Sequence, residues 1–171
     1  MDDIIPDTAF SEVKLPSYFK WKASPKIPYE ESGVMIAAPR KVLVSPKMQI
    51  PVCASAIIED VEVPYRETVW DVIVGVAVDV QANRVYAGTL ADPRMTPDPE
   101  HDQPRPQANE SASPPARLSR GETIVRIYGN FDLRELLGIP PAPGTLYVHF
   151  TLGSHQSNVV RVDLVLDRGE D

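Results

Sequence analysis

The longest alternation of apolar and polar residues in the chain covers residues 70–80. Its every second position is a tryptophan or a valine, namely Trp70, Val72, Val74, Val76, Val78 and Val80. Because successive side chains of a β-strand point to opposite faces, this spacing places all six on one face. The pattern predicts one long strand whose valine face is buried. On that interpretation, replacing Val76 with Asp is expected to unfold the domain by burying an unpaired charge.

The same alternation predicts strands elsewhere in the chain. Residues 34–38 and 41–44 are interpreted as one strand interrupted at Pro39, a position that indicates a sheet edge. Further strands are expected at residues 85–90 and 122–131, and at 49–59. In the last of these, one face is formed by Ile50, Val52, Ala54, Ala56 and Ile58. A short helix is predicted from Asp132, a good N-cap, to Gly138, with Glu135 at the capping-box spacing.

Two hairpins follow from matching apolar residues across facing strands. A two-residue turn at Ala82-Asn83 would pair Val80 with Val85, and Asn83 tolerates the left-handed backbone that such a turn needs. A turn at residues 153–157 would join the last two strands. In that register Phe150 faces Val160, Val148 faces Val162, Leu146 faces Leu164, Tyr147 meets Asp163 and His149 meets Arg161. The apolar side of this hairpin is expected to pack across the core against the valine face, and its polar side indicates an antiparallel sheet that is wet on one side.

These elements predict an all-β fold. Seven or eight strands, turns rich in proline and glycine, and a single short helix are typical of an antiparallel β-sandwich. With 171 residues and 18 prolines, the chain is long enough for one domain and poorly suited to a helical one. We divide it into an extended proline-rich arm (1–32), a single sandwich domain (33–167) with a long mobile loop (91–120), and a tail (168–171).

The closing strands resemble those of a known fold. Residues 143–150, followed by 157–162, are similar to the last two strands of immunoglobulin-like and fibronectin-type-III-like domains. Cys53 and Trp70 stand roughly where an immunoglobulin domain has its first cysteine and core tryptophan. The resemblance implies a sandwich over residues 33–167.

This resemblance has two departures from the antibody pattern. His149 stands where a second cysteine is expected, and the register above turns Tyr147 outward instead of into a tyrosine corner. Sandwiches of this kind host many functions, so the resemblance implies a fold and no particular activity.

Composition narrows the classes of partner and compartment. The formal net charge of −7 and pI near 5.0 argue against a nucleic-acid partner, which needs a clustered basic face. No apolar run approaches the ~20 residues of a membrane span, so membrane insertion is not expected. The absence of a signal peptide and the single cysteine, Cys53, predict a cytoplasmic protein with a buried thiol. The alternative is an exported protein whose leader has been removed.

Catalytic chemistry has no clear signature in the sequence. The histidines His101, His149 and His155 have no set of acidic or cysteine partners at a metal-ligand spacing, apart from Asp163. Neither a phosphate-binding glycine loop nor a nucleophilic triad is recognisable. We therefore expect no cofactor, no metal and no enzyme, and a hydrolase ranks third among the functions considered.

The function expected is that of an interaction or assembly module, which contacts a protein partner or neighbouring subunits through its arm, loops and edge strands. The candidate partner-binding residues are Tyr18, Phe19, Trp21, Tyr147, His149 and Arg161. For the aromatic residues of the arm, the first interpretation is packing on their own sandwich, the second is docking on another subunit, and the last is stacking on nucleic acid. The second function is carbohydrate binding. Its stacking platform would be drawn from Trp21, Tyr65, Tyr86 and Tyr147.

Overall fold

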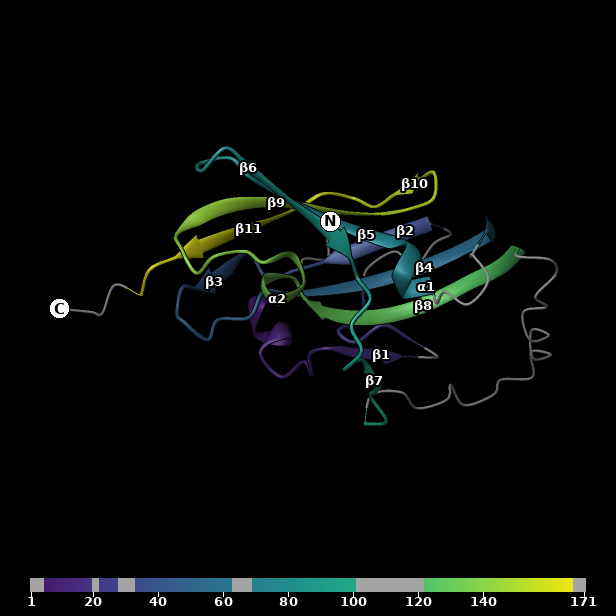
Figure 1. Cartoon of the computed structure of the whole chain (residues 1–171). Helices are drawn as coiled ribbons and strands as arrows, with labels where there is room; N and C mark the ends of the chain where they lie inside the picture. The colour runs from purple at the N-terminus through teal and green to yellow at the C-terminus, as the bar shows by residue number, and fades with distance from the viewer. Residues whose placement is uncertain (1–4, 20–21, 28–32, 63–68, 101–121, 168–171) are drawn as a thin grey trace.

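The computed structural model describes residues 5–19, 22–27, 33–62, 69–100 and 122–167, in which two β-sheets pack face to face (Figure 1). Sheet A contains, in spatial order, β2 (Gly33–Ala37), β4 (Pro51–Glu62), β8 (Glu122–Asp132), β1 (Ser17–Phe19) and β7 (Thr96–Pro97). Sheet B contains β3 (Lys41–Leu43), β11 (Val160–Val165), β9 (Gly144–Leu152), β5 (Ile73–Asp79) and β6 (Arg84–Thr89), with β10 (His155–Gln156) paired to β9. The predicted all-β sandwich is confirmed.

The sheets differ from the prediction in being mixed. β1 runs parallel to β7, and β3 runs parallel to β11, whereas the other pairs are antiparallel. The parallel pair in sheet B arises because the chain leaves the edge of sheet A after β2, turns at Pro39 and enters the edge of sheet B as β3. The predicted edge location is therefore confirmed, but the single interrupted strand is two strands in two sheets.

Two short α-helices and a 3₁₀ turn, η1 (Asp7–Phe10), accompany the sheets. The predicted helix is α2 (Leu133–Leu137), whose N-cap Asp132 accepts a hydrogen bond from the Arg134 amide and whose C-cap Gly138 is left-handed, with φ 66°. The second helix, α1 (Val69–Val72), was not expected. It takes up the first positions of the predicted strand at residues 70–80, so that strand begins only at Ile73.

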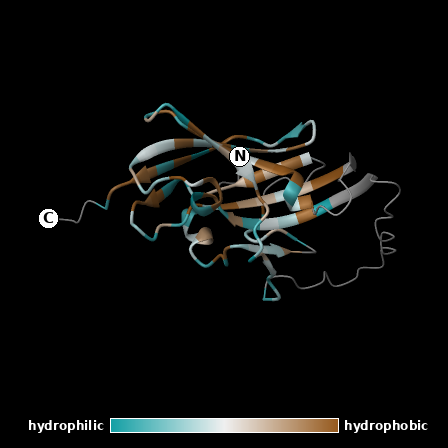
Figure 2. Cartoon of the chain, viewed as in Figure 1, coloured by the Kyte–Doolittle hydropathy of each residue, from teal (hydrophilic) through white to brown (hydrophobic). Residues whose placement is uncertain are grey.

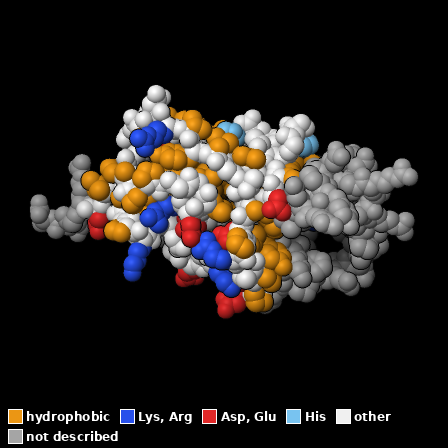
Figure 3. All heavy atoms as spheres, viewed as in Figure 1, with side chains coloured by type: hydrophobic (Ala, Val, Ile, Leu, Met, Phe, Trp, Pro, Cys, Tyr) orange, Lys and Arg blue, Asp and Glu red, His pale blue; other side chains and the backbone are white. Residues whose placement is uncertain are grey.

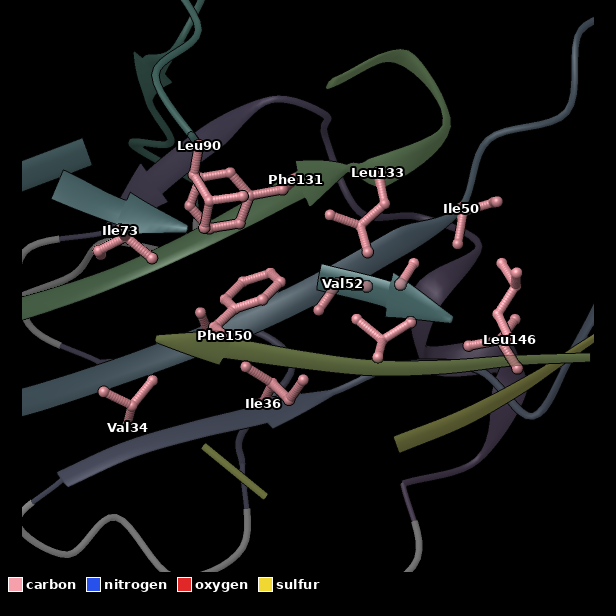
Figure 4. Packing of buried hydrophobic residues seen from close by; sticks show 14 of the residues in the cluster. Val34, Ile36, Ile50, Val52, Ile73, Leu90, Phe131, Leu133, Leu146 and Phe150 are labelled. Carbon is pink, nitrogen blue, oxygen red and sulfur yellow. The ribbon is translucent and has the colours of Figure 1, made fainter. Parts of the chain in front are cut away.

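The main core lies between the two sheets and is built from both. The face of β4 predicted from the sequence is confirmed, because its five apolar residues are all buried in this core. Three aromatic rings form its centre: Phe131 lies edge-on to Trp70 at 5.3 Å and to Phe150 at 5.9 Å between ring centroids. Figure 4 shows Phe131 and Phe150 between the strands with Leu90, Ile73 and Val52 around them.

The valine face of β5 points away from this core, which reverses the prediction. Ile73, Gly75 and Ala77 are the inward residues, and Val74, Val76 and Val78 lie half-buried on the other face. The cause is the volume of the neighbouring side chains. A Cβ at Gly75 would stand 3.0 Å from Leu90 and 3.4 Å from Phe150, so only small residues fit beneath them. Moreover, β5 and β9 are hydrogen-bonded neighbours in one sheet, and do not face each other across the core.

The N-terminal segment covers the other side of sheet A. Phe10, Phe19, Ala23 and Ile27 form a second buried cluster with Cys53 and Tyr128, which project from β4 and β8 away from sheet B. Figure 1 shows this segment beneath sheet A, and Figure 2 shows that hydrophobic residues also mark the strands of both sheets. For Phe19 the structure bears out the first interpretation, packing on its own sandwich.

Both predicted hairpins exist with their registers shifted by two residues. In the first, Val78 pairs with Val85 and Val76 with Ala87, so the loop is longer than the predicted Ala82-Asn83. Asn83 is left-handed as expected, with φ 51°.

In the closing hairpin, Val160 pairs with Val148, Arg161 with Tyr147, Val162 with Leu146 and Asp163 with Thr145. A shift of two preserves the faces, so the predicted buried side of β9 is confirmed.

The predicted mobile loop at residues 91–120 is only partly described. Its first part is ordered in the structure: Met95 donates a backbone hydrogen bond to Asp92, Thr96–Pro97 forms β7, and the Asp98 amide donates to the Tyr18 carbonyl. This part carries the chain from the edge of sheet B to the edge of sheet A. The remainder lies outside the described residues, as does the tail at residues 168–171.

Candidate interaction surface

The face of sheet B turned away from the core carries the clearest candidate site, and we call it the outer face. Directly paired residues form two rows across it. One row runs from β6 to β11 as Val85, Val78, Tyr147 and Arg161, and the next contains Ala87, Val76 and His149. The residues of a row are neighbours because directly opposite Cβ atoms in a sheet are about 5 Å apart.

The half of the outer face on β5 and β6 is apolar. Val85 is 67% exposed, and the valines of β5 lie half-buried beside it. In the space-filling view, hydrophobic side chains gather over this part of sheet B (Figure 3). Isolated apolar residues are normal on a protein surface, but a contiguous stripe of them marks an interaction site.

The half of the outer face on β9, β11 and β3 is polar and ordered by Asp163. Its Oδ1 accepts hydrogen bonds from the Thr145 hydroxyl at 2.9 Å and from Nε and Nη2 of Arg161 at 3.0 Å each. Partial burial by itself would raise the pKa of Asp163. The hydrogen bonds from Thr145 and Arg161, with the charges of Arg161 and Lys41, outweigh that effect and hold the pKa below its ordinary value. The guanidinium of Arg161 is thereby held at Asp163, two residues along β11.

A groove of about 500 Å³ continues the polar half toward the turn between β2 and β3. It is lined by Ala38, Arg40, Val160, Arg161 and Asp163. Lys41 stands opposite Asp163 in the neighbouring strand. The Asp7 carboxylate accepts hydrogen bonds from the backbone amides of Arg40 and Lys41, so three cationic side chains share this corner with two carboxylates. These groups leave an excess of one positive charge at this corner, although the whole chain carries a formal charge of −7.

The structure brings together three of the six predicted partner-binding residues. Tyr147, His149 and Arg161 share the outer face, with Tyr147 39% exposed. The shifted register changes their pairing: Arg161 stands opposite Tyr147, and His149 stands opposite Val76 on β5.

The predicted residues of the arm lie elsewhere. Phe19 is 3% exposed inside the second cluster, because its side chain points from β1 into the space under sheet A. It is therefore not available to a partner in this structure. Tyr18 points the other way and lies half-buried, with its ring 6.4 Å from that of Trp70. Trp21 lies outside the described residues.

The aromatic residues considered for carbohydrate stacking do not share a platform where they are described. Tyr147 is on the outer face of sheet B, whereas Tyr86 is on the opposite face of β6 and packs against the core. Trp21 and Tyr65 lie outside the described residues. No common aromatic surface can be built from the two that are placed.

Among the described residues, groups with catalytic or metal-binding chemistry are dispersed. Within the parts of the chain that the structure describes, no three His, Cys, Asp or Glu side chains come close enough to hold a metal ion. His149 lies on the outer face and His155 in β10 at the end of the hairpin. Burial raises the pKa of the Cys53 thiol far above its ordinary value, so this cysteine is held as an unreactive thiol.

The apolar half of the outer face was not expected from the sequence. The valines were recognised, but they were assigned to the core. The only available signal was the pair Gly75 and Ala77, whose small side chains leave room for large ones from neighbouring strands. The small residues become informative only once Phe150 is known to lie beside Gly75. That neighbour follows from the strand pairing, which the sequence does not specify.

Comparisons of this chain with models of protein families, with curated proteins and with solved structures find no match. A separate observation concerns membranes: among the described residues, no helix is both long and apolar enough to cross a bilayer.

Proposed function

We propose that this chain is a non-enzymatic interaction module that binds a protein partner, or a neighbouring subunit, through the outer face of sheet B. The observation that carries the proposal is the direction of the β5 valines. They continue an apolar stripe from Val85 to Tyr147 on a face that no described element covers. Sheet A, in contrast, has its corresponding face buried by the N-terminal segment.

The chemistry of the outer face indicates the kind of partner surface that would fit. Tyrosine and arginine are enriched among the residues that dominate binding energy at protein interfaces, and Tyr147 and Arg161 stand side by side here. Asp163 orients the guanidinium, which lowers the entropy lost when Arg161 is immobilised on binding. The excess of one positive charge at the corner of Arg40, Lys41 and Arg161, which remains beside Asp7 and Asp163, favours a carboxylate. We therefore propose a partner surface with an apolar centre and an acidic rim.

The direct test is site-specific photo-cross-linking followed by measured binding. A photoreactive residue at Tyr147 is expected to yield a covalent adduct with one protein, whereas the same residue at the exposed Lys47, in the loop between β3 and β4, is not. For the partner identified in that adduct, Arg161→Glu and Val76→Lys are each expected to weaken binding at least about tenfold. Lys47→Glu is the matched control and should bind as the unmodified chain does.

The proposal is contradicted if position 147 gives no adduct in cells, or if both outer-face variants keep full affinity while remaining folded by circular dichroism. A sugar that quenches the tyrosine fluorescence of this chain, and that the cross-linked partner does not displace, would instead favour the carbohydrate alternative.

Two finer attributes belong to the same proposal. The likeness of the closing hairpin to immunoglobulin-like and fibronectin-type-III-like domains is supported by the alternation in β9 and β11. Cys53, by contrast, departs from the immunoglobulin pattern. It stands roughly where the first immunoglobulin cysteine is expected, but it projects into the second cluster and not between the sheets. A reducing, cytoplasmic setting is consistent with a buried cysteine that has no partner for a disulfide.

A further inference from the structure

As far as the chain is described, the two sheets have four edges, and three of them are closed. At the β2 edge, the side-chain amide of Asn158 imitates a neighbouring strand: its Oδ1 accepts from the Ile36 amide at 2.8 Å, and its Nδ2 donates to the Ile36 carbonyl at 3.0 Å. At the β3 edge, the Asp7 carboxylate accepts from the backbone amides of Arg40 and Lys41 at 2.7 and 3.2 Å. The β7 edge has two residues, one of them Pro97.

The fourth edge, β6, has none of these devices. Between Val85 and Thr89 it contains no proline, no charged residue and no bulge in its pairing with β5. Natural sheets use such features to prevent edge-to-edge association. Their absence from one edge of four indicates an edge that is available for pairing. Figure 1 shows β6 and its turn at the top of sheet B.

The backbone groups free to pair on β6 can be identified from its bonds to β5. Leu90 donates its amide to the Ile73 carbonyl at 3.0 Å, so Leu90 and Ile73 form a hydrogen-bonded pair. Since such pairs alternate along antiparallel strands, the amides and carbonyls of Gly88, Tyr86 and Arg84 also point to β5. Those of Val85, Ala87 and Thr89 therefore point outward, and their three side chains are exposed on the outer face.

We propose that a second copy of this chain pairs with β6, antiparallel and about a two-fold axis through Ala87. In this register Val85 stands opposite Thr89 of the other copy, and Ala87 stands opposite Ala87. All three outward residues of each copy then form hydrogen-bonded pairs, with two bonds per pair and six in total. The sheets B of the two copies become one continuous sheet, and their apolar halves become adjacent.

The register is favoured by both hydrogen bonding and charge. Any other two-fold register leaves at least one outward residue of each copy unpaired. Centring the pair on Val85 would also bring the two Arg84 side chains close together. With the axis at Ala87, each Arg84 is opposite Leu90 and the two lie about 20 Å apart along the strands, beyond the roughly 10 Å range of electrostatic repulsion in salt. Because the β6 edge carries no carboxylate, two chains of net charge −7 can approach there.

This inference rests on the proposed interaction role of sheet B and names one occupant of its open edge. A single strand pair buries less surface than a standard protein interface, so the dimer is expected to be weak, with a dissociation constant of about 10–100 µM.

Disulfide trapping tests the register on the full chain. Ala87→Cys should oxidise to a covalent dimer, because residues directly opposite each other in a sheet are within disulfide distance. Val85→Cys alone and Thr89→Cys alone should not, because each residue is about 14 Å from its own symmetry mate. A mixture of the Val85→Cys and Thr89→Cys chains should cross-link, since these two positions face each other. The native Cys53 is buried and does not compete.

A matched pair of substitutions at one position tests whether the backbone makes the contact. Ala87→Pro removes an amide that β5 does not use, and should abolish the dimer in sedimentation equilibrium at about 100 µM chain while the fold persists. Ala87→Val keeps the amide and should retain the dimer.

A monomer at that concentration, or cross-linking of Val85→Cys as fast as Ala87→Cys, would overturn the proposal. If the chain is monomeric but position 147 still cross-links to a different protein, the edge proposal fails and the proposed function stands. If the dimer forms but the outer-face variants bind the partner with full affinity, the edge proposal stands and the proposed function fails.

Discussion

The Asp163 carboxylate shows how single residues shape the outer face. It accepts hydrogen bonds from one hydroxyl and two guanidinium nitrogens at a single oxygen, and its side chain is 26% exposed. An exposed pair of this kind adds little to stability on its own. The effect of Asp163 is instead to fix the Arg161 side chain along the surface of the sheet. Arg161, one of the candidate partner-binding residues, is thus pre-organised by a residue that does not itself need to touch the proposed partner.

The lowered pKa of Asp163 predicts a pH dependence with a definite sign. In the unfolded chain this carboxyl titrates near 4, and in the folded protein it titrates lower. Its stabilising contribution is therefore complete above about pH 4 and is lost as the pH falls through the folded pKa. Asp163→Asn should lower the melting temperature at pH 7 and flatten its fall between pH 5 and 2, as measured by circular dichroism. An equally steep fall in the variant would show that Asp163 has no part in it.

Among the elements, the irregular segment at residues 157–160 explains two findings. It accounts for the wrong register predicted for the closing hairpin, and it closes the β2 edge. Ser157 pairs with Phe150 through its backbone amide and its side-chain hydroxyl, at 2.8 Å each. Val160 already pairs with Val148, so Ser157–Val160 spans three steps while Phe150–Val148 spans two, which is the geometry of a bulge. The extra residue frees Asn158 to bond β2.

Asn158 is expected to be important for both stability and solubility. Replacing it with Ala should leave the Ile36 amide and carbonyl without a partner and cost about 1–3 kcal/mol in the free energy of unfolding. It should also open the β2 edge and promote aggregation, which light scattering would detect. Gln156→Ala, an exposed change two residues away, is the control and should alter neither. Equal stabilities of the two variants in chemical denaturation would contradict this role.

The sequence predicts elements well where one face is clearly apolar and a turn has strong signals. The buried face of β4, the capped helix α2 and the inward face of β9 are confirmed for that reason. The register of paired strands is harder to predict, because a shift of two residues keeps every side chain on the same face and leaves the apolar alternation unchanged. The alternation in β9 and β11 fits the predicted and the observed pairing equally well, and only the bulge at Asn158 distinguishes them.

The described molecule has three layers, and their order leaves one surface uncovered. The N-terminal segment covers sheet A, sheet A covers one face of sheet B, and the outer face of sheet B is uncovered in the described structure. This arrangement brings Tyr147, His149 and Arg161 together as candidates and removes Phe19 from that role.

The sequence could not determine this arrangement, because both faces of β5 are free of charge until Asp79 and either can face a core. The choice depends on the volume of Phe150 and Leu90, which come from other parts of the chain.

The proposed surface and its open edge both depend on the direction of the β5 valines. The direct measurement compares the free energy of unfolding of Val76→Asp and Ala77→Asp by chemical denaturation. Val76→Asp places a charge on the outer face and should fold with a loss of about 1 kcal/mol, the scale of strand propensity. Ala77→Asp buries an unpaired charge in the core and should not fold. A folded Ala77→Asp variant beside an unfolded Val76→Asp variant would show that the valines face the core.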